Sequence, residues 1–275
     1  MNDSATVTAG SLEVPGARLH YEVRGKGPVV VLVGSPMDDV AFAPVADLLA
    51  VDHTVVTLDP RGINRSSVED RALDSTIEMR ADDLSRLLTH LDAGPAVVFG
   101  SSGGAVVALA LVQAHPEQVH TVVAHEPPLG ELLDDREQVR RQTEDMLATY
   151  SAGDVTGAWD KFFRQANIDM PEDTVEQMFG GERDPQAVAD EQFWFANELR
   201  STVYWRPDVA VLRDGPTHVV VGIGEESGGQ FCDRTSTALA AALGIEPTRF
   251  PGDHIGFVNV PERFAVELRA VLGKS

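Results

Sequence analysis

The stretch Gly100-Ser101-Ser102-Gly103-Gly104 limits what this chain can fold into more than any other part of the sequence. It follows the apolar run 95–99 and precedes the apolar run 105–112, so a short buried strand must turn abruptly into a helix. The glycines before and after Ser102 keep side chains out of the crowded turn. We therefore expect the Ser102 hydroxyl to project from the carboxyl end of a strand, with the amide of Gly103 at the N-terminus of the next helix.

Strands and helices alternate along most of the chain, which predicts a mainly parallel central sheet flanked by helices. The predicted strands are 28–33, 53–58, 95–99, 119–124, 218–221 and 248–250, and a predicted antiparallel hairpin comprises 11–14 and 18–23. The predicted helices are 40–49, 76–91 with Ser75 as N-cap, 105–112, 236–243, and 261–272 with Gly273 beyond its end.

Residues 129–207 interrupt this alternation with helical periodicity, and Asp154 and Asp184 are candidate helix caps. We interpret this segment as a helical cap inserted into a core domain formed by 1–128 and 208–275. The cap contains most of the aromatic residues of the chain and could therefore roof an apolar pocket. Most of these rings are expected to pack helices together, and Trp194 is predicted to contact substrate.

Composition excludes several classes of partner. With 275 residues, 43% of them hydrophobic, the chain can bury one sizeable core. Its formal net charge of -21 repels nucleic acid and anionic lipid, so neither nucleic acid nor a membrane is an expected partner. Cys232, the single cysteine, cannot form an intrachain disulfide or a cysteine-based zinc site. The first residues lack the features of a signal peptide, so a cytoplasmic location is predicted. No metal or cofactor is expected. The sequence does not predict an oligomeric state.

Ser102 is suited to be a nucleophile, but a serine hydroxyl needs a positioned base, and the base needs a third group that orients it. His254 is the best candidate base, because its loop follows the last predicted strand and lies on the sheet edge where Ser102 is expected. Several other histidines begin or lie in predicted strands and are assigned structural positions, namely His20, His53, His120 and His218, and His90 lies on a predicted surface helix.

Two carboxylate positions could supply the orienting acid, since both follow strands that end at the same edge. Glu126 is held by the adjoining Pro127-Pro128, whereas Glu225 and Glu226 lie in a glycine-rich loop. A triad acid must be fixed in order to orient an imidazole, so Glu126 is the preferred acid and Glu225 or Glu226 is the alternative. The chain order of nucleophile, acid and histidine holds for either choice.

The second donor to an oxyanion should come from the loop after strand 28–33. Pro36 has no N–H, so the Ser35 amide is the expected partner of the Gly103 amide, with Met37 second. Met37 is also predicted to contact substrate.

Three motifs together resemble the α/β-hydrolase superfamily: the stretch 100–104, Asp59-Pro60-Arg61-Gly62 with Ser66 after it, and Gly252-Asp253-His254. The resemblance covers nearly the whole chain outside the cap. It implies an α/β-hydrolase fold with an inserted helical cap.

Within that superfamily the chain is similar to the zearalenone-type lactone hydrolases, in Gly100-x-Ser102-x-Gly104, His125-Glu126-Pro127-Pro128 and Phe250-Pro251-Gly252-x-His254. The acid of those enzymes follows the strand after the nucleophile, which independently favours Glu126. The loop 34–37 instead looks like the Gly-Gly-Pro loop of proline iminopeptidases, and the cap shows no match, so no substrate carries over.

We therefore expect a cofactor-independent serine hydrolase that cleaves a small apolar ester or lactone through an acyl-enzyme. Ser102 would attack, His254 would transfer the proton, and Glu126 would orient His254. The alternatives are a receptor or carrier for a small ligand on the same fold, a perhydrolase, or a carbon–carbon hydrolase. Haloalkane dehalogenase activity is disfavoured, because those enzymes use an aspartate at the position of Ser102.

Overall fold

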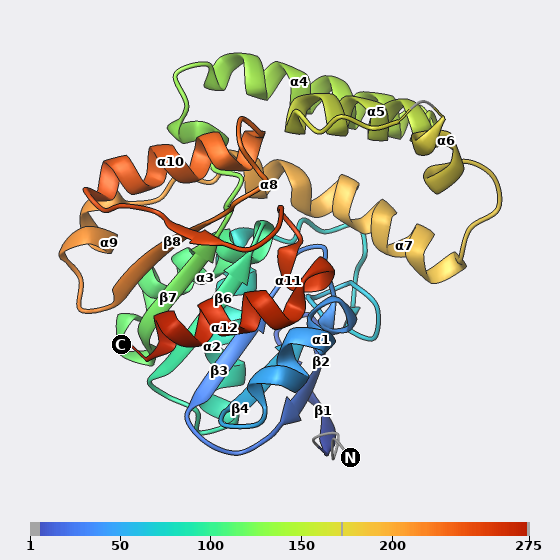
Figure 1. Cartoon of the computed structure of the whole chain (residues 1–275). Coiled ribbons are helices and arrows are strands. Elements are labelled where there is room, and N and C mark those ends of the chain that lie inside the picture. Colours follow the sequence, from blue (N-terminus) through green and yellow to red (C-terminus); the bar gives the residue numbers. More distant parts are fainter. Residues whose placement is uncertain (1–5, 172, 274–275) are drawn as a thin grey trace.

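A mainly parallel sheet forms the centre of the protein (Figure 1). The structure is a computed structural model that describes residues 6–171 and 173–273. In these residues nine strands form one sheet in the order β1-β2-β4-β3-β6-β7-β8-β9, with β5 paired to β2. The strands are β1 Val7–Val14, β2 Ala17–Arg24, β3 Val29–Val33, β4 Thr54–Leu58, β5 Ser67–Val68, β6 Ala96–Ser101, β7 Val119–His125, β8 His218–Gly224 and β9 Thr248–Phe250.

The burial of each strand follows from its place in the sheet. Strands β3, β4, β6, β7, β8 and β9 pair in parallel, and every residue of β6 is buried, as its unbroken apolar sequence predicts. The hairpin of β1 and β2 is antiparallel and lies at one edge; β1 is mostly exposed, whereas buried residues of β2 alternate with less buried ones from Ala17 to Tyr21. The predicted hairpin is confirmed, and β1 extends further back, to Val7.

Helices cover both faces of the sheet and bury a separate apolar cluster on each. One face carries α1 Asp39–Leu49, α11 Gly256–Asn259 and α12 Pro261–Leu272, and the other carries α2 Ile77–His90, α3 Gly103–Ala114, α9 Val209–Asp214 and α10 Phe231–Leu243. A short helix, η1 Pro116–Gln118, leads into β7. The expected fold class, a parallel sheet flanked by helices, is confirmed.

Two predicted helix starts are wrong. Thr76, not Ser75, caps α2, because the Thr76 side chain accepts the N–H of Met79. Ser75 is buried, and its hydroxyl instead donates to Glu198 of the inserted segment. Helix α10 begins at Phe231, well before the predicted 236. The predicted caps Asp154 and Asp184 are confirmed, as each accepts an N–H of the first turn of its helix.

Residues 129–207, called the cap below, lie over the carboxyl ends of the strands (Figure 1). The cap contains η2 Gly130–Leu132, α4 Arg136–Ser151, α5 Val155–Ala166, α6 Thr174–Phe179, α7 Pro185–Phe193, the π-helical turn η3 Trp194–Glu198 and α8 Leu199–Tyr204. A cluster of buried side chains from α4, α5, η3 and α8 holds these helices together and reaches Phe231 of α10. Among the described helices, none combines the length and the apolar character of a transmembrane span.

Candidate active site

Ser102 lies at a strained corner between β6 and α3. Its φ of 55° and ψ of -125° are unfavourable for a residue with a side chain, and its N–H donates to the carbonyl of His125 on the neighbouring strand (2.9 Å). A Cβ on Gly100 would lie 2.4 Å from the carbonyl oxygen of Gly104, and one on Gly104 would lie 2.1 Å from that of Val33. Only glycine fits at either position, which explains the motif and places Ser102 beside the end of β3.

Strand register sets Ser102 and Glu126 next to each other. Ser101 pairs with His125 across β6 and β7, and Ser102 and Glu126 are the residues that follow this pair. Glu126 also has a positive φ, of 52°, and its N–H donates to the Gly222 carbonyl of β8 (3.0 Å). The two side chains therefore leave the sheet at the same edge.

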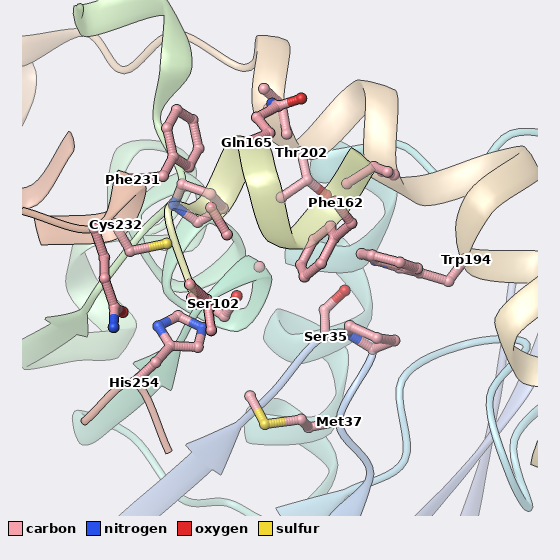
Figure 2. Close-up of a pocket in the computed structure, with 18 of the residues that line it drawn as sticks. Ser35, Met37, Ser102, Phe162, Gln165, Trp194, Thr202, Phe231, Cys232 and His254 are labelled. Atoms are coloured by element: carbon pink, nitrogen blue, oxygen red, sulfur yellow. The ribbon is translucent and has the colours of Figure 1, made fainter. Parts of the chain in front are cut away.

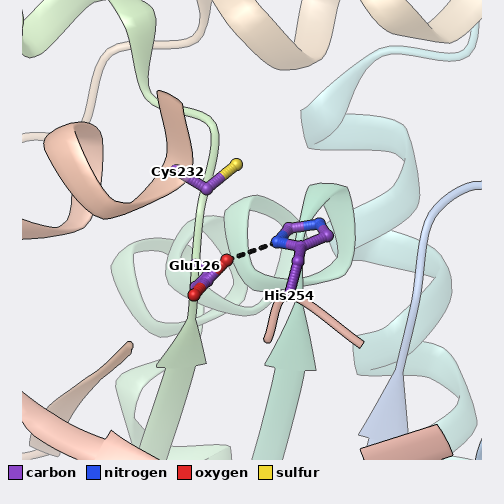
Figure 3. A group of neighbouring side chains, drawn as sticks. All are labelled: Glu126, Cys232 and His254. Carbon is purple, nitrogen blue, oxygen red and sulfur yellow. Dashed lines mark hydrogen bonds and ion pairs between the residues drawn. The ribbon is translucent and has the colours of Figure 1, made fainter. Parts of the chain in front are cut away.

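The carboxylate of Glu126 is fully buried and both of its oxygens are bonded. Oε2 forms a hydrogen bond with Nδ1 of His254 (2.5 Å; dashed line in Figure 3), and Oε1 accepts the N–H of Gly224 (2.8 Å). Burial alone would raise the pKa of Glu126, but the hydrogen bond and charge of His254 lower it to about 2. Glu126 is thus a fixed anion against the imidazole at neutral pH.

His254 connects this carboxylate to Ser102. It lies in the loop after β9, and Figure 2 shows its ring beside Ser102 at the floor of a pocket that both residues line. Burial by itself lowers the imidazole pKa, but Cys232 and Glu126 beside the ring raise it well above the usual value. The structure thus brings together the three residues of the preferred triad.

The carboxylates of the two alternative acids do not bond His254. Glu225 and Glu226 are exposed, and the carboxylate of Glu225 approaches Arg263 on α12 (3.4 Å). Their backbone N–H groups donate to the carbonyls of Phe250 (2.8 Å) and Gly252 (2.9 Å), so they help to hold the loop that carries His254. Within the described part of the chain, Glu126 is the carboxylate that bonds His254.

Ser35 and Gly103, the expected oxyanion residues, line the pocket beside Ser102. A Cβ on Gly103 would lie 2.8 Å from the carbonyl oxygen of Ser35, so the loop after β3 packs directly on the start of α3. The amide of Gly103 is the first of helix α3, where N–H groups have no partner within the helix. An N–H in this position can donate a hydrogen bond to an oxygen that becomes negatively charged.

The pocket is apolar and has a volume of about 510 Å³. Aromatic side chains from the cap and from α10 form much of its wall: Trp159, Phe162, Trp194 and Phe231. Met37 and Trp194, predicted to contact substrate, both line it (Figure 2). Of the described residues in this wall, none is Lys, Arg, Asp or Glu. The pocket therefore suits an uncharged ligand.

Most other cap aromatics serve packing. Phe195 stacks on Tyr150, with 4.1 Å between ring centroids, and Phe193 lies under the guanidinium of Arg71. A further carboxylate, Glu191, accepts hydrogen bonds from the Trp159 indole N–H (2.7 Å) and the Tyr150 hydroxyl (2.8 Å). Glu191 thereby fixes the tilt of a ring that lines the pocket.

The sulfur of Cys232 lies close to Glu126 and His254. Potential ligand atoms of Glu126, Cys232 and His254 lie within 4.8 Å of one another (Figure 3). A zinc ion bonded to both Glu126 and His254 would hold their atoms about 3.3 Å apart, since each metal bond is about 2.0 to 2.2 Å long. At 2.5 Å the two residues instead form a direct hydrogen bond, so the group fits acid–base chemistry better than a metal.

A second group of carboxylates already surrounds a cation. Asp39, Asp59 and Glu22 converge on the guanidinium of Arg65, whose Nε lies 2.9 Å from Asp59 and whose Nη1 lies 3.0 Å from Glu22. Burial and the neighbouring Asp59 raise the pKa of Asp39 to about 7. Arg65 fills the place that a metal ion would take, and the arrangement fits a structural role at the end of β4.

Sequence reasoning assigned no role to His125, Arg80 or Glu198. His125 is buried beside Glu126, its Nδ1 lies 3.2 Å from the Ser101 hydroxyl, and burial lowers its pKa to about 4. It is therefore a neutral packing residue. Arg80 and Glu198 form a buried ion pair behind Ser35. A charged residue in a helix normally indicates a face exposed to solvent, so nothing in the sequence indicates that Arg80 and Glu198 are buried.

Comparisons with known proteins agree with the fold. A family model described as alpha/beta hydrolase fold matches residues 27–158. The chain is 33% identical to the uncharacterized hydrolase YraK of Bacillus subtilis, over 98% of this chain and 97% of that one. It is 26% identical to a zearalenone hydrolase of Bionectria ochroleuca, over 94% and 95% of the two chains.

Solved structures share the fold at lower identity. The esterase EaEST from Exiguobacterium antarcticum superposes with a TM-score of 0.72 at 18% identity, with 95% of this chain and 97% of that chain covered. Est816, described as an N-acyl homoserine lactone degrading enzyme, superposes with a TM-score of 0.71 at 20% identity, with 95% and 99% covered.

Proposed function

The chain belongs to the α/β-hydrolase family, and from this premise we propose that it is a serine hydrolase of carboxylic esters or lactones. One observation carries the proposal: the buried Glu126 carboxylate bonds the imidazole of His254, and that imidazole lies beside Ser102 at the floor of an apolar pocket (Figures 2 and 3). The names of the zearalenone hydrolase relatives and of the esterase and lactone-degrading neighbours support an ester or lactone bond as the bond that is cleaved.

In the proposed mechanism, Oγ of Ser102 attacks the acyl carbon while Nε2 of His254 takes the hydroxyl proton. Glu126 keeps the Nδ1–H of His254 directed at itself, which leaves Nε2 free to accept, and it stabilises the imidazolium that forms. The amides of Gly103 and Ser35 stabilise the oxyanion. The oxyanion then collapses, the C–O bond breaks, and His254 gives its proton to the leaving alcohol.

Water completes the cycle by the reverse sequence. His254 takes a proton from water, the resulting hydroxide attacks the acyl-enzyme, and Ser102 leaves with the proton returned by His254. For a lactone, the leaving alcohol stays attached to the acyl group, so the product is a single hydroxy acid. Water and the substrate apart, each step uses groups of the chain named above.

The pocket limits the substrate to compounds with apolar, uncharged groups on both sides of the bond. Its volume of about 510 Å³ admits a small molecule with one or two rings, and its aromatic walls favour ring stacking. We therefore propose aryl esters and ring-containing lactones as the substrate class. A panel of such compounds tests the function: multiple turnovers support a hydrolase, whereas tight retention of one equivalent without turnover would favour the receptor or carrier alternative.

We expect kcat/KM for an uncharged ester to rise with pH and then level off, with a midpoint above the ordinary histidine value of about 6.5. The imidazole of His254 acts only when neutral, and its raised pKa keeps it protonated, and the enzyme inactive, to a higher pH. A pH profile from about 5 to 9 measures the midpoint. A midpoint below about 6.5 would contradict the raised pKa of His254, and a rate that is constant across this range would contradict its role as the base.

We expect Trp194→Leu to lower kcat/KM for an aryl ester by about tenfold, mainly through KM, because the pocket loses apolar ring contact. Trp205→Leu is the matched control, since Trp205 lines a separate surface cavity near α2 and α3. Equal KM values in the two variants would show that Trp194 does not contact substrate.

A further inference from the structure

A buried ion pair lies directly behind the pocket wall. Nη1 of Arg80, on α2, is 3.4 Å from Oε2 of Glu198, at the end of the π-helical turn η3. The side chain of Arg80 is 3% exposed and that of Glu198 is fully buried. Isolated charges at such depth are very costly, so the pair must be held together.

Both charges converge on one hydroxyl of the pocket. Nη1 of Arg80 donates to Oγ of Ser35 (2.8 Å), and the same Oγ donates to Oε2 of Glu198 (2.8 Å). The Ser35 hydroxyl is therefore fixed both as acceptor and as donor by charged partners, which make stronger hydrogen bonds than neutral ones. Figure 2 shows Ser35 beneath Trp194 and Thr202, on the side of the pocket that faces the cap.

The network joins three segments that are distant in sequence. Glu198 also accepts from the Ser75 hydroxyl at Oε1 (3.3 Å), and Nη2 of Arg80 donates to Thr202 on α8 (2.9 Å). The loop after β3, the start of α2 and the cap thus meet at Ser35. This explains why Ser75 is drawn inward and does not cap α2.

The π-helical turn gives the network its link to the substrate pocket. Trp194 at one end of the turn lines the pocket, and Glu198 at the other end bonds Ser35. The N–H of Leu199 bonds the carbonyl of Trp194, the wide hydrogen bond of a π-helix, and such turns occur often at functional sites.

Stability alone does not account for this pair. Well-packed apolar residues often stabilise a core as much as a buried ion pair does, so its charges are weak evidence for a stabilising role. A second buried ion pair joins Asp83 of α2 to Arg61, but it does not contact Ser35. Arg80 and Glu198 differ from it because both bond the hydroxyl of Ser35. The amide of Ser35 is a proposed oxyanion donor.

We propose that Arg80 and Glu198 are positioning residues, which hold the Ser35 peptide in the oxyanion hole so that docking of the cap completes the hole. The inference rests on the proposed hydrolase function. Removal of one oxyanion donor costs about 10²–10³-fold in kcat, so a donor that is displaced and not lost should cost less.

The first experiment compares Ser35→Ala with Glu198→Gln. Ser35→Ala removes the hydroxyl and leaves the amide and the ion pair in place. We expect each variant to lose about 10- to 100-fold in kcat with KM within about twofold, and to lose affinity for a trifluoromethyl ketone by the same factor as kcat. Such a ketone becomes an oxyanion on the enzyme, so its affinity reports the oxyanion hole and a purely structural defect would not lower it in parallel.

The double variant Ser35→Ala/Glu198→Gln tests whether Glu198 acts through Ser35. We expect it to lose no more kcat than Ser35→Ala alone, because the two changes remove one shared function. Glu198→Gln leaves Arg80 buried without a counter-charge, so Arg80→Met/Glu198→Gln, which removes both charges, repeats the measurement if the single variant does not fold.

Asp83→Asn is the control, since it breaks a buried ion pair of the same helix (2.7 Å) that does not contact Ser35. We expect it to lower the melting temperature and leave kcat unchanged. Wild-type kcat and ketone affinity in Ser35→Ala, or equal losses in Asp83→Asn and Glu198→Gln, would overturn the inference. If Ser102→Ala is inactive in the same assays, the hydrolase function survives that outcome; if Ser102→Ala is active, the function itself is wrong.

Discussion

Ser102→Ala is expected to lower kcat by at least about 10⁴-fold, and a fluorophosphonate probe is expected to label the wild-type protein at Ser102 and not to label the variant. Without Oγ the proposed nucleophile is lost, and Gly103, the other residue of this corner that lines the pocket, has no side chain. Alanine fits the space of serine, so the fold and the apolar pocket should persist. Rate measurements together with mass spectrometry of the labelled peptide decide the result.

Ser101→Ala is the matched control for this experiment. Ser101 is adjacent in sequence, but its hydroxyl is buried against His125 (3.2 Å) and does not line the pocket. We expect the control to keep its labelling and to keep kcat within a few-fold. Labelling that persists in Ser102→Ala, or full activity in that variant, would rule out the proposed acyl-enzyme.

Glu126→Gln is expected to have the second largest effect, a loss of about 10³–10⁴-fold in kcat with little change in KM. The amide keeps the volume of the carboxylate but cannot hold His254 in the tautomer that leaves Nε2 free, and it no longer stabilises the imidazolium. Because Gly224 still donates to one side-chain oxygen, the variant is expected to fold. Residual activity, if measurable, should also titrate at lower pH.

Glu225→Gln and Glu226→Gln are the controls for the acid, since both side chains are exposed and lie on the loop beside His254. We expect each to change kcat by no more than about twofold, with melting temperatures compared across all three variants. A folded and active Glu126→Gln beside an inactive Glu225→Gln would assign the acid to the loop after β8, despite the contact between Glu126 and His254.

Local patterns in the sequence were sufficient for much of the fold and for two of the proposed triad residues. The glycines around Ser102 report a turn that only glycine permits, and this signal needs no knowledge of distant residues. Apolar runs identified the parallel strands, because these are buried on both faces. His254 was found because it follows the last strand, and parallel strands end at one edge.

The choice of acid depended on tertiary structure. Glu126 and Glu225 both follow strands at the same sheet edge, and local rigidity and the resemblance to zearalenone-type lactone hydrolases favoured Glu126 without showing its contact with His254. The contact between Glu126 and His254 joins residues 128 positions apart, so no local pattern contains it. Strand register and the loop after β9 decided it. The start of α2 shows the same limit: the sequence favours Ser75 as the helix cap, but Glu198 of the inserted segment draws the Ser75 hydroxyl away and Thr76 caps the helix.

The sequence by itself therefore determined the strand–helix alternation, the turn at Ser102 and the candidate base, because each follows from short-range sterics or hydrophobic periodicity. Only the tertiary structure decided which carboxylate meets His254 and which charges support Ser35. Arg80 and Glu198 are 118 positions apart, and each alone resembles an ordinary polar residue on a helix surface. Their burial and their shared contact with Ser35 exist only once the cap is packed against α2 and the loop after β3, because long-range packing sets which polar groups lose water and must find each other.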